Sequence, residues 1–366
     1  MSSTLKNRRS QTILSMHSRF PAILTALSAA ALFGATTPIA KALLGPMPPF
    51  MVAGLFYLGS GVGLGAILLG RAFMRATNEG LRAREIAWLF GAIAFGGVAG
   101  PALLMLGLTS TPAATSSLLL NLEGVLTAAI AWIVFRENVD FSVFLGMAAI
   151  VAGGVVLAWQ PGAAHATTGA LLIALACLCW AIDNNLTRRI STADAMLIAC
   201  AKGLVAGAVN LGIALAMGAH LPALHIVAGA MTTGFGGYGV SLVLFVIALR
   251  GLGTARTGAY FSVAPVFGVA LSLAMWPQTP GASFWIAAAL MTLGVWLHVR
   301  ERHEHVHTHE PLEHTHRHVH DEHHRHVHDF PYSGDEPHTH PHVHLPITHS
   351  HAHFPDIHHR HAHKHG

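Results

Sequence analysis

The sequence predicts an all-α membrane protein with ten transmembrane helices in two inverted five-helix repeats, followed by a disordered histidine-rich tail. Three observations support this fold class. Hydrophobic residues make up 52% of the 366 residues and charged residues only 10%, whereas a soluble domain carries about a quarter charged residues. Apolar runs of about 20 residues, the length that spans a bilayer, recur before residue 300. Of the 29 histidines, 24 follow Arg300.

Ten apolar segments are long enough to cross the hydrocarbon core. They are residues 20–44, 49–70, 85–106, 112–134, 141–159, 168–187, 195–217, 226–249, 252–276 and 282–299. The first is too long to be the apolar region of a signal peptide, so we expect it to be retained. The predicted organisation is therefore a cytoplasmic segment at 1–19, a first repeat at 20–160, a second repeat at 161–300 and a tail at 301–366.

Lysine and arginine occupy alternate connections between these segments. They lie before the first helix, in the connections between helices 2 and 3, 4 and 5, 6 and 7, and 8 and 9, and after helix 10. The opposite connections hold none, apart from Lys41 near the end of the first helix. Because basic residues stay on the cytoplasmic side, we predict an inner (cell) membrane protein with both termini in the cytoplasm.

Several other classes fit poorly. Three cysteines in apolar surroundings make no disulfide framework. Residues 1–300 hold 16 Lys and Arg against 7 Asp and Glu, a balance of +9, and the tail holds 5 against 10, a balance of −5. The basic excess thus flanks membrane segments, and nucleic-acid binding is not needed to explain it. We find no nucleophile–base constellation or nucleotide motif, so we expect no enzyme and no required cofactor.

The two halves of the body resemble each other weakly. A shift of 146 residues aligns residues 32–35 with 178–181, and a shift of 141 aligns 118–125 with 259–266. Five helices is an odd number, so the second half must enter the membrane in the opposite orientation. Inverted repeats are typical of transporters, with the substrate site near the midplane.

Specific motifs carry a family resemblance over about residues 20–300. Residues 33–38 resemble an opening Trp-Gly motif, residues 115–125 a helix 4 pattern, and residues 179–181 and 263–266 their second-half counterparts. The chain thus resembles the EamA-type members of the drug/metabolite transporter (DMT) superfamily. That resemblance implies ten helices in two inverted repeats and export of an amino acid, metabolite, drug or ion. The sequence departs from the family pattern at Gly124 (usually Pro), at Phe56 (often Arg) and at Gln278, the counterpart of Glu137.

Four ionisable residues fall inside predicted spans, where such groups are costly and are functional candidates. They are Lys41, Glu123, Asp183 and Lys202. Glu123 lies near the middle of the fourth span, where desolvation favours the protonated carboxyl. It is either a proton carrier or cation ligand, or a neutral acid hydrogen-bonded to a neighbouring helix.

Asp183 and Lys202 lie about ten residues on either side of the turn at 191–194. In an antiparallel hairpin this symmetry places both at similar depth, about 10–15 Å from the cytoplasmic face at 1.5 Å per residue. They form either a static ion pair or a switchable one, in which cargo or a proton competes for Asp183. Asn184 supplies a further oxygen beside the pair, and Cys179 lies one turn back. The predicted substrate and proton path comprises Glu123, Asp183, Asn184, Lys202, Asn121 and Thr36.

The tail carries alternating histidines, so that neighbouring His-x-His pairs share one side of an extended chain. Neutral imidazole suits Zn, Cu, Ni and Co(II), and we expect the tail to bind such a divalent ion and to be disordered without it. The predicted metal ligands are His303, His305, His307, His309, His314, His316, His318, His320, His323, His324, His326, His328, His338, His340, His342 and His344.

Three functions fit these features. The first is export of a divalent transition metal, Ni or Co ahead of Zn, by proton antiport, with the tail as a local collector. The second is export of an amino acid or other small metabolite, in which Lys202 binds the substrate carboxylate and the tail is regulatory. The third is a metal sensor or store whose membrane part is an anchor. The expected partners are the lipid bilayer, the cargo and protons, with no nucleic acid and the oligomeric state left open.

Overall fold

The computed structural model describes residues 2–73, 86–135, 141–159, 167–187, 194–252, 254–277 and 279–300, and the tail segments 304–308, 312–318, 338–344 and 348–352. Residues 1–300 form one compact unit and residues 301–366 a second one. The predicted boundary between the repeats, at 160/161, lies outside the described residues, as do Glu137 and Gln278.

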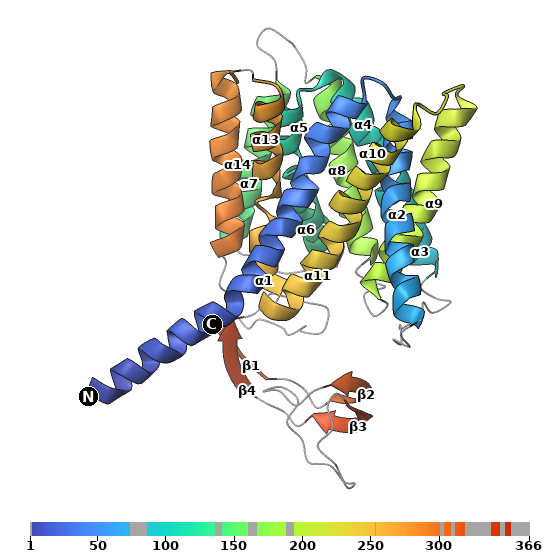
Figure 1. Ribbon diagram of the computed structural model, residues 1–366. Helices are drawn as coiled ribbons and strands as arrows, with labels where there is room; N and C mark the ends of the chain where they lie inside the picture. Colours follow the sequence, from blue (N-terminus) through green and yellow to red (C-terminus); the bar gives the residue numbers. More distant parts are fainter. Residues whose placement is uncertain are drawn as a thin grey trace. The chain divides into compact units, whose positions relative to one another are not determined.

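The first unit is a helical bundle (Figure 1). Its first half contains α1 (Ser2–Leu43), α2 (Pro49–Phe73), α3 (Ile86–Ala92), η2 (Ile93–Ala99), α4 (Gly100–Ser110), α5 (Ala113–Leu119), α6 (Leu122–Phe135) and α7 (Phe141–Ala158). Its second half contains α8 (Thr168–Thr187), α9 (Ala195–Ala216), α10 (Leu224–Gly234), η4 (Phe235–Val240), α11 (Ser241–Leu252), α12 (Thr254–Phe261), α13 (Ala264–Met275) and α14 (Ala282–Arg300).

Among the described residues, eight helical segments are long and apolar enough to cross a membrane, from Pro21–Leu43 to Leu224–Ala248. They correspond to the first eight predicted spans. The ninth and tenth predicted spans fall on the shorter apolar helices Ala264–Met275 and Ala282–Leu297. The ninth is shortened because the chain turns at residues 262–263, and Pro265 opens α13 where its missing N–H is tolerated.

Helix interruptions occur at matching places in the two halves. The π-helical segments η2 and η4 each interrupt a long helix and each contain the sequence Phe-Gly-Gly, at residues 95–97 and 235–237. Turns at residues 120–121 and 262–263 likewise separate α5 from α6 and α12 from α13. Broken helices at corresponding positions of two halves are typical of transporter folds.

Helix packing follows the same correspondence. α2 packs on α9 and α7 on α14, which are equivalent helices of the two halves. In the first half, α4 and α6 both pack on α8 of the second half. In the second half, α11 and α13 both pack on α1 of the first half in the corresponding way. Exchanging the halves therefore maps these packed pairs onto one another.

Glycines allow the close approach of α2 and α9. A Cβ atom on Gly61 would lie 2.5 Å from the backbone nitrogen of Leu204, and one on Gly207 would lie 2.5 Å from the nitrogen of Leu58. Small residues at helix contacts permit tight packing in membranes, which explains the glycine-rich stretch of α2.

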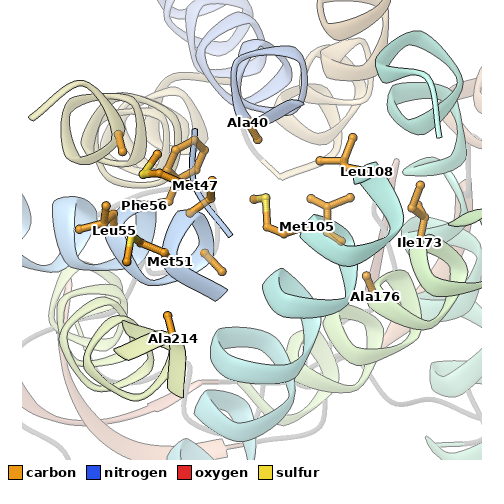
Figure 2. Close-up of a cluster of buried hydrophobic side chains, with 14 of the residues drawn as sticks. Ala40, Met47, Met51, Leu55, Phe56, Met105, Leu108, Ile173, Ala176 and Ala214 are labelled. Carbon is orange, nitrogen blue, oxygen red and sulfur yellow. The ribbon is translucent and has the colours of Figure 1, made fainter. Parts of the chain in front are cut away.

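The largest apolar core joins α1, α2, α4, α8 and α9, and Figure 2 shows ten of its residues by name. Met51 and Phe56 of α2 are completely buried beside Met105 and Leu108 of α4. Phe56, where the sequence departs from the pattern it resembles, therefore occupies a packed apolar position.

The described part of the second unit consists of four short strands, β1 (Glu304–Thr308), β2 (Leu312–His318), β3 (His338–His344) and β4 (Thr348–Ala352). β1 pairs antiparallel with β4, and β2 with β3. These ladders differ from the expected tail without regular structure. The physical reason is that histidine alternates there with residues such as Val and Thr, a period-two pattern that an extended strand accommodates.

Candidate functional site

Glu123 lies in the first turn of α6, just after the turn that separates α5 from α6. Its side chain is half-buried and faces α8, where the Asn184 amide donates a 2.9 Å hydrogen bond to its Oε1. The same amide lies 3.3 Å from the hydroxyl oxygen of Thr127, one turn along α6. The helix N-terminus also favours a carboxylate at this place. The break in the fourth span thus gives Glu123 a polar setting inside an apolar helix.

Asp183 of α8 and Lys202 of α9 form an ion pair with 2.5 Å between Oδ2 and Nζ, which confirms the predicted pairing. The Asp183 side chain is 7% exposed and that of Lys202 is 17% exposed. The second oxygen of Asp183 accepts a 2.9 Å hydrogen bond from the Thr187 hydroxyl. The carboxylate also packs against η2, because a Cβ on Gly96 would lie 1.9 Å from its Oδ2.

The π-helical segment η2 presents carbonyl groups to three other helices. Gly100 donates its N–H to Phe95 O instead of Gly96 O, and Pro101 has no N–H to give to Gly97 O. Gly96 O accepts hydrogen bonds from the Tyr57 hydroxyl (2.8 Å) and the Trp180 indole N–H (3.0 Å).

Asn210 of α9 supplies the third side chain, since its amide lies 3.3 Å from both Gly97 O and Val98 O. Sequence reasoning missed Tyr57, Trp180 and Asn210. A sequence signal was present. The Gly96–Gly97 pair, with Pro101 four residues further on, interrupts the regular hydrogen bonding of a helix and leaves carbonyls that side chains of other helices can bind.

The structure places Thr36 and Asn121 in other surroundings. The Asn121 amide donates to Leu118 O at 2.9 Å and lies 3.9 Å from Met291 Sδ on α14. The Thr36 hydroxyl donates to Phe33 O at 2.7 Å, and its methyl group packs against Gly237 of η4. The described hydrogen bonds of both residues therefore do not join them to Glu123 or Asp183.

An aromatic cluster lies between Thr36 and the carbonyls of η2. The ring of Tyr238 in η4 lies 6.0 Å from that of Phe33, 6.0 Å from that of Phe56 and 5.4 Å from that of Tyr57. Since Tyr57 also bonds to η2, this cluster connects the interruption of the second half with that of the first.

Two of the three cysteines occupy helix contacts. Cys177 is buried with its sulfur 3.7 Å from Leu119 O, and Cys200 is buried with its sulfur 3.3 Å from Gly61 O. Among the side chains that the structure describes, no three His, Cys, Asp or Glu residues come together as a metal-ligand group.

Nine of the predicted tail ligands lie in three of the four strands, β1, β2 and β3. They are His305, His307, His314, His316, His318, His338, His340, His342 and His344. The other seven lie outside the described residues, namely His303, His309, His320, His323, His324, His326 and His328.

The charges in the body determine what its site can bind. Glu123 accepts its hydrogen bond from Asn184, the residue after Asp183 on α8, and we treat it with the Asp183–Lys202 pair as one set of charges. With all three ionised the set carries a net charge of −1, and with Glu123 protonated it carries none. Since uncompensated charge is costly within a membrane, a proton and a cation would compete for this one negative charge.

Apolar spans, interrupted helices and ionisable side chains held between them are features of a multi-pass membrane transporter. The model of the EamA-like transporter family matches residues 20–159 and again residues 167–300. The chain belongs to this family, part of the DMT superfamily, and is a membrane transporter.

Two further comparisons agree. An uncharacterized transporter of Methanothermobacter thermautotrophicus is 26% identical over 288 residues, which cover 74% of this chain and 84% of that protein. A solved crystal structure superposes with a TM-score of 0.56 at 20% identity, covering 76% of this chain and 96% of the other. At this identity the second likeness concerns the fold alone.

Proposed function

We propose that the chain exports a divalent transition metal ion, Ni or Co ahead of Zn, from the cytoplasm in exchange for protons. The observation that carries this proposal is the single net negative charge of the Glu123, Asp183 and Lys202 set. Exchange of cargo for protons requires a site that binds the cargo on one side of the membrane and a proton on the other. A carboxylate whose charge is not compensated lets the ion and the proton compete for the same place.

Alternating access would use the correspondence between the two halves. In this scheme the halves are inverted repeats, both termini are cytoplasmic, and the bundle lies in the inner membrane. Helix segments rotate at the interruptions, which are η2, η4 and the turns at residues 120–121 and 262–263. A π-helical segment or a turn within a span lets one part of the helix move without the other.

Within the site, each residue has a proposed role. Glu123 exchanges a proton for the ion, and Asn184 orients the Glu123 carboxyl through its 2.9 Å hydrogen bond. Lys202 holds Asp183 while the site is empty and releases it when cargo arrives. Thr127 offers a hydroxyl oxygen within the same cluster.

The histidine-rich tail favours a metal cargo. Of the 29 histidines 24 follow Arg300, and neutral imidazole is the side chain that Ni, Co and Zn share as a ligand. A tail with this composition raises the local concentration of ions beside the transport unit, and the acidic residues among the histidines add charge attraction.

A second candidate cargo is an amino acid or other small metabolite. The ammonium group of Lys202 suits a substrate carboxylate. The partly exposed rings of Tyr57, Trp180 and Tyr238 suit an organic group. In this case the tail regulates transport in response to metal.

The test is flux in proteoliposomes under a pH gradient, with Ni, Co, Zn and a set of amino acids as cargo. The full chain is compared with a chain ending at Arg300 and with Glu123→Gln. Glu79→Gln, an equal change in the connection between α2 and α3, is the matched control. We expect gradient-driven Ni or Co flux that Glu123→Gln abolishes and Glu79→Gln leaves intact.

Truncation at Arg300 should retain metal flux but require a higher metal concentration. Absence of metal flux in both chain lengths would refute the metal proposal. Amino-acid flux that is lost in Lys202→Met would establish the second candidate instead. Metal flux of Glu123→Gln with unchanged pH dependence would remove Glu123 from the mechanism.

A further inference from the structure

A pocket of about 610 Å³ opens where α1 and α4 end and α5 begins. Its wall includes Lys41, Thr111, Trp159, Ser272 and Trp276. None of the transport roles proposed above uses it, and its contents are therefore a separate question.

The pocket lies at the opposite end of the bundle from the Asp183–Lys202 pair. Gly169, near the start of α8, packs against the hydroxyls of Ser110 and Thr111 beside the pocket. Asp183 follows 14 residues further along the same helix, which corresponds to about 21 Å at 1.5 Å per residue. With cytoplasmic termini, the pocket would open on the outer side.

Lys41 gives this pocket its charge, because it is the one ionisable side chain among the described residues that line it. Its ammonium donates to Leu108 O and, at 3.2 Å, to Thr109 O, two carbonyls in the last turn of α4. An ammonium has three N–H donors, so one remains for a ligand. No carboxylate among the described side chains forms an ion pair with Lys41.

The lining adds hydroxyl donors without adding negative charge. Thr111 is 4% exposed, and its hydroxyl oxygen has no hydrogen-bond partner in the described structure. Thr115, Thr279 and Ser283 line the same pocket. A cation fits poorly beside an unneutralised ammonium, whereas hydroxyls and one ammonium together suit the oxygens of an anion.

Two tryptophans indicate the depth of the pocket. Trp159 is about half exposed and follows α7, and Trp276 follows α13. Tryptophan favours the boundary between hydrocarbon and headgroups, so the pocket lies at the level where lipid phosphates are found.

We propose that this pocket is a binding site for an oxyanion, with Lys41 as its charged contact and the hydroxyls of Thr115, Thr279 and Ser283 as its neutral donors. The oxyanion is a phosphate group, which is supplied either by the headgroup of an anionic lipid or by a soluble phosphate. The site is independent of the cargo proposed for the transporter.

The test uses the full chain and measures ligand retention and stability, with no transport assay. Purified protein is exposed to phosphatidylglycerol or phosphatidylcholine in mixed micelles, and retained lipid is counted by native mass spectrometry. In a second arm, the melting temperature is measured in inorganic phosphate and in chloride at equal ionic strength. The variants are Lys41→Gln, Lys41→Arg and, as a matched control in the tail, Lys364→Gln.

We expect the wild type to retain phosphatidylglycerol over phosphatidylcholine and Lys41→Gln to weaken this preference about tenfold, the effect of losing one hydrogen bond to a charged group. Lys41→Arg and Lys364→Gln should keep the preference. A phosphate-specific rise in melting temperature without lipid retention assigns the site to a soluble phosphate. If the wild type shows neither effect, or if Lys41→Gln leaves both unchanged, Lys41 only caps α4 and the proposal is wrong.

Discussion

The ion pair between Asp183 and Lys202 makes the sharpest prediction for the transport unit. Replacing Asp183 with Asn removes one charge while keeping the size of the side chain and an oxygen that can accept the Thr187 hydroxyl. The lost interaction is therefore confined to the 2.5 Å contact with Lys202. Lys202 then loses its direct ion-pair partner, with 17% of its side chain exposed, and Glu123 is the carboxyl that remains in the set.

The size of the effect follows from burial. Breaking a buried ion pair by removing one partner costs about 3–5 kcal/mol, because the remaining charge loses its compensation. Since Lys202 keeps a small exposed fraction, we expect the lower end, about 3 kcal/mol, for Asp183→Asn. Replacing both residues, as Asp183→Asn with Lys202→Met, removes both charges of the pair, leaves the net charge of the set unchanged and should lie within about 1 kcal/mol of the wild type.

The assay is the free energy of unfolding in mixed micelles, followed by the fluorescence of the seven tryptophans. The two single variants and the double variant form a cycle whose coupling energy isolates the pair. If the double variant is as unstable as the sum of the single ones, the two side chains do not compensate each other and the reasoning is refuted. Proteoliposome flux of the stable double variant then separates the roles: normal flux indicates a static ion pair, and lost flux indicates a working one.

Three further predictions concern the packing of η2 and the tail. Gly96→Ala should destabilise the protein by about 1–3 kcal/mol, because its Cβ would lie 1.9 Å from Asp183 Oδ2. The same unfolding assay in micelles measures this change. The control is Gly124→Ala, whose Cβ meets nothing within 4 Å and which should not lose stability. Asn210→Leu should cost about 2 kcal/mol, since two η2 carbonyls lose the amide that lies 3.3 Å away; unchanged stability would mean that water or another side chain replaces the amide. The amount of metal that the full chain retains should fall as the pH drops from 7.5 to 5.5. The reason is that protonation of imidazole, with an ordinary pKa of about 6.5, blocks the nitrogen that binds metal. Elemental analysis after dialysis measures the retained metal, and equal retention by a chain ending at Arg300 would place the metal in the body.

Much of the bundle could be predicted from the sequence because each span is a property of one segment. Apolar length alone located the eight membrane-length helices among the described residues. The match of the family model to residues 20–159 and 167–300 agrees with the resemblance found in the motifs at 33–38 and 115–125. Family membership also disfavours the sensor or storage hypothesis.

The Asp183–Lys202 pair was also accessible to sequence reasoning. The two residues lie equally far from one short turn, and in an antiparallel hairpin equal separation from the turn gives equal depth. No knowledge of other helices was needed, and the structure confirms the contact.

Only the tertiary structure decided which partners the other polar side chains of the body have. It brings Asn184 to Glu123 and Asn210 to the carbonyls of η2, while Asn121 turns toward α14. It also surrounds Lys41 with hydroxyls at the far end of the bundle. The reason is that hydropathy and spacing determine whether a segment crosses the membrane and at what depth a residue lies. Contacts between helices depend in addition on the rotation of each helix about its axis and on the breaks at η2 and residues 120–121, which only the packed bundle determines.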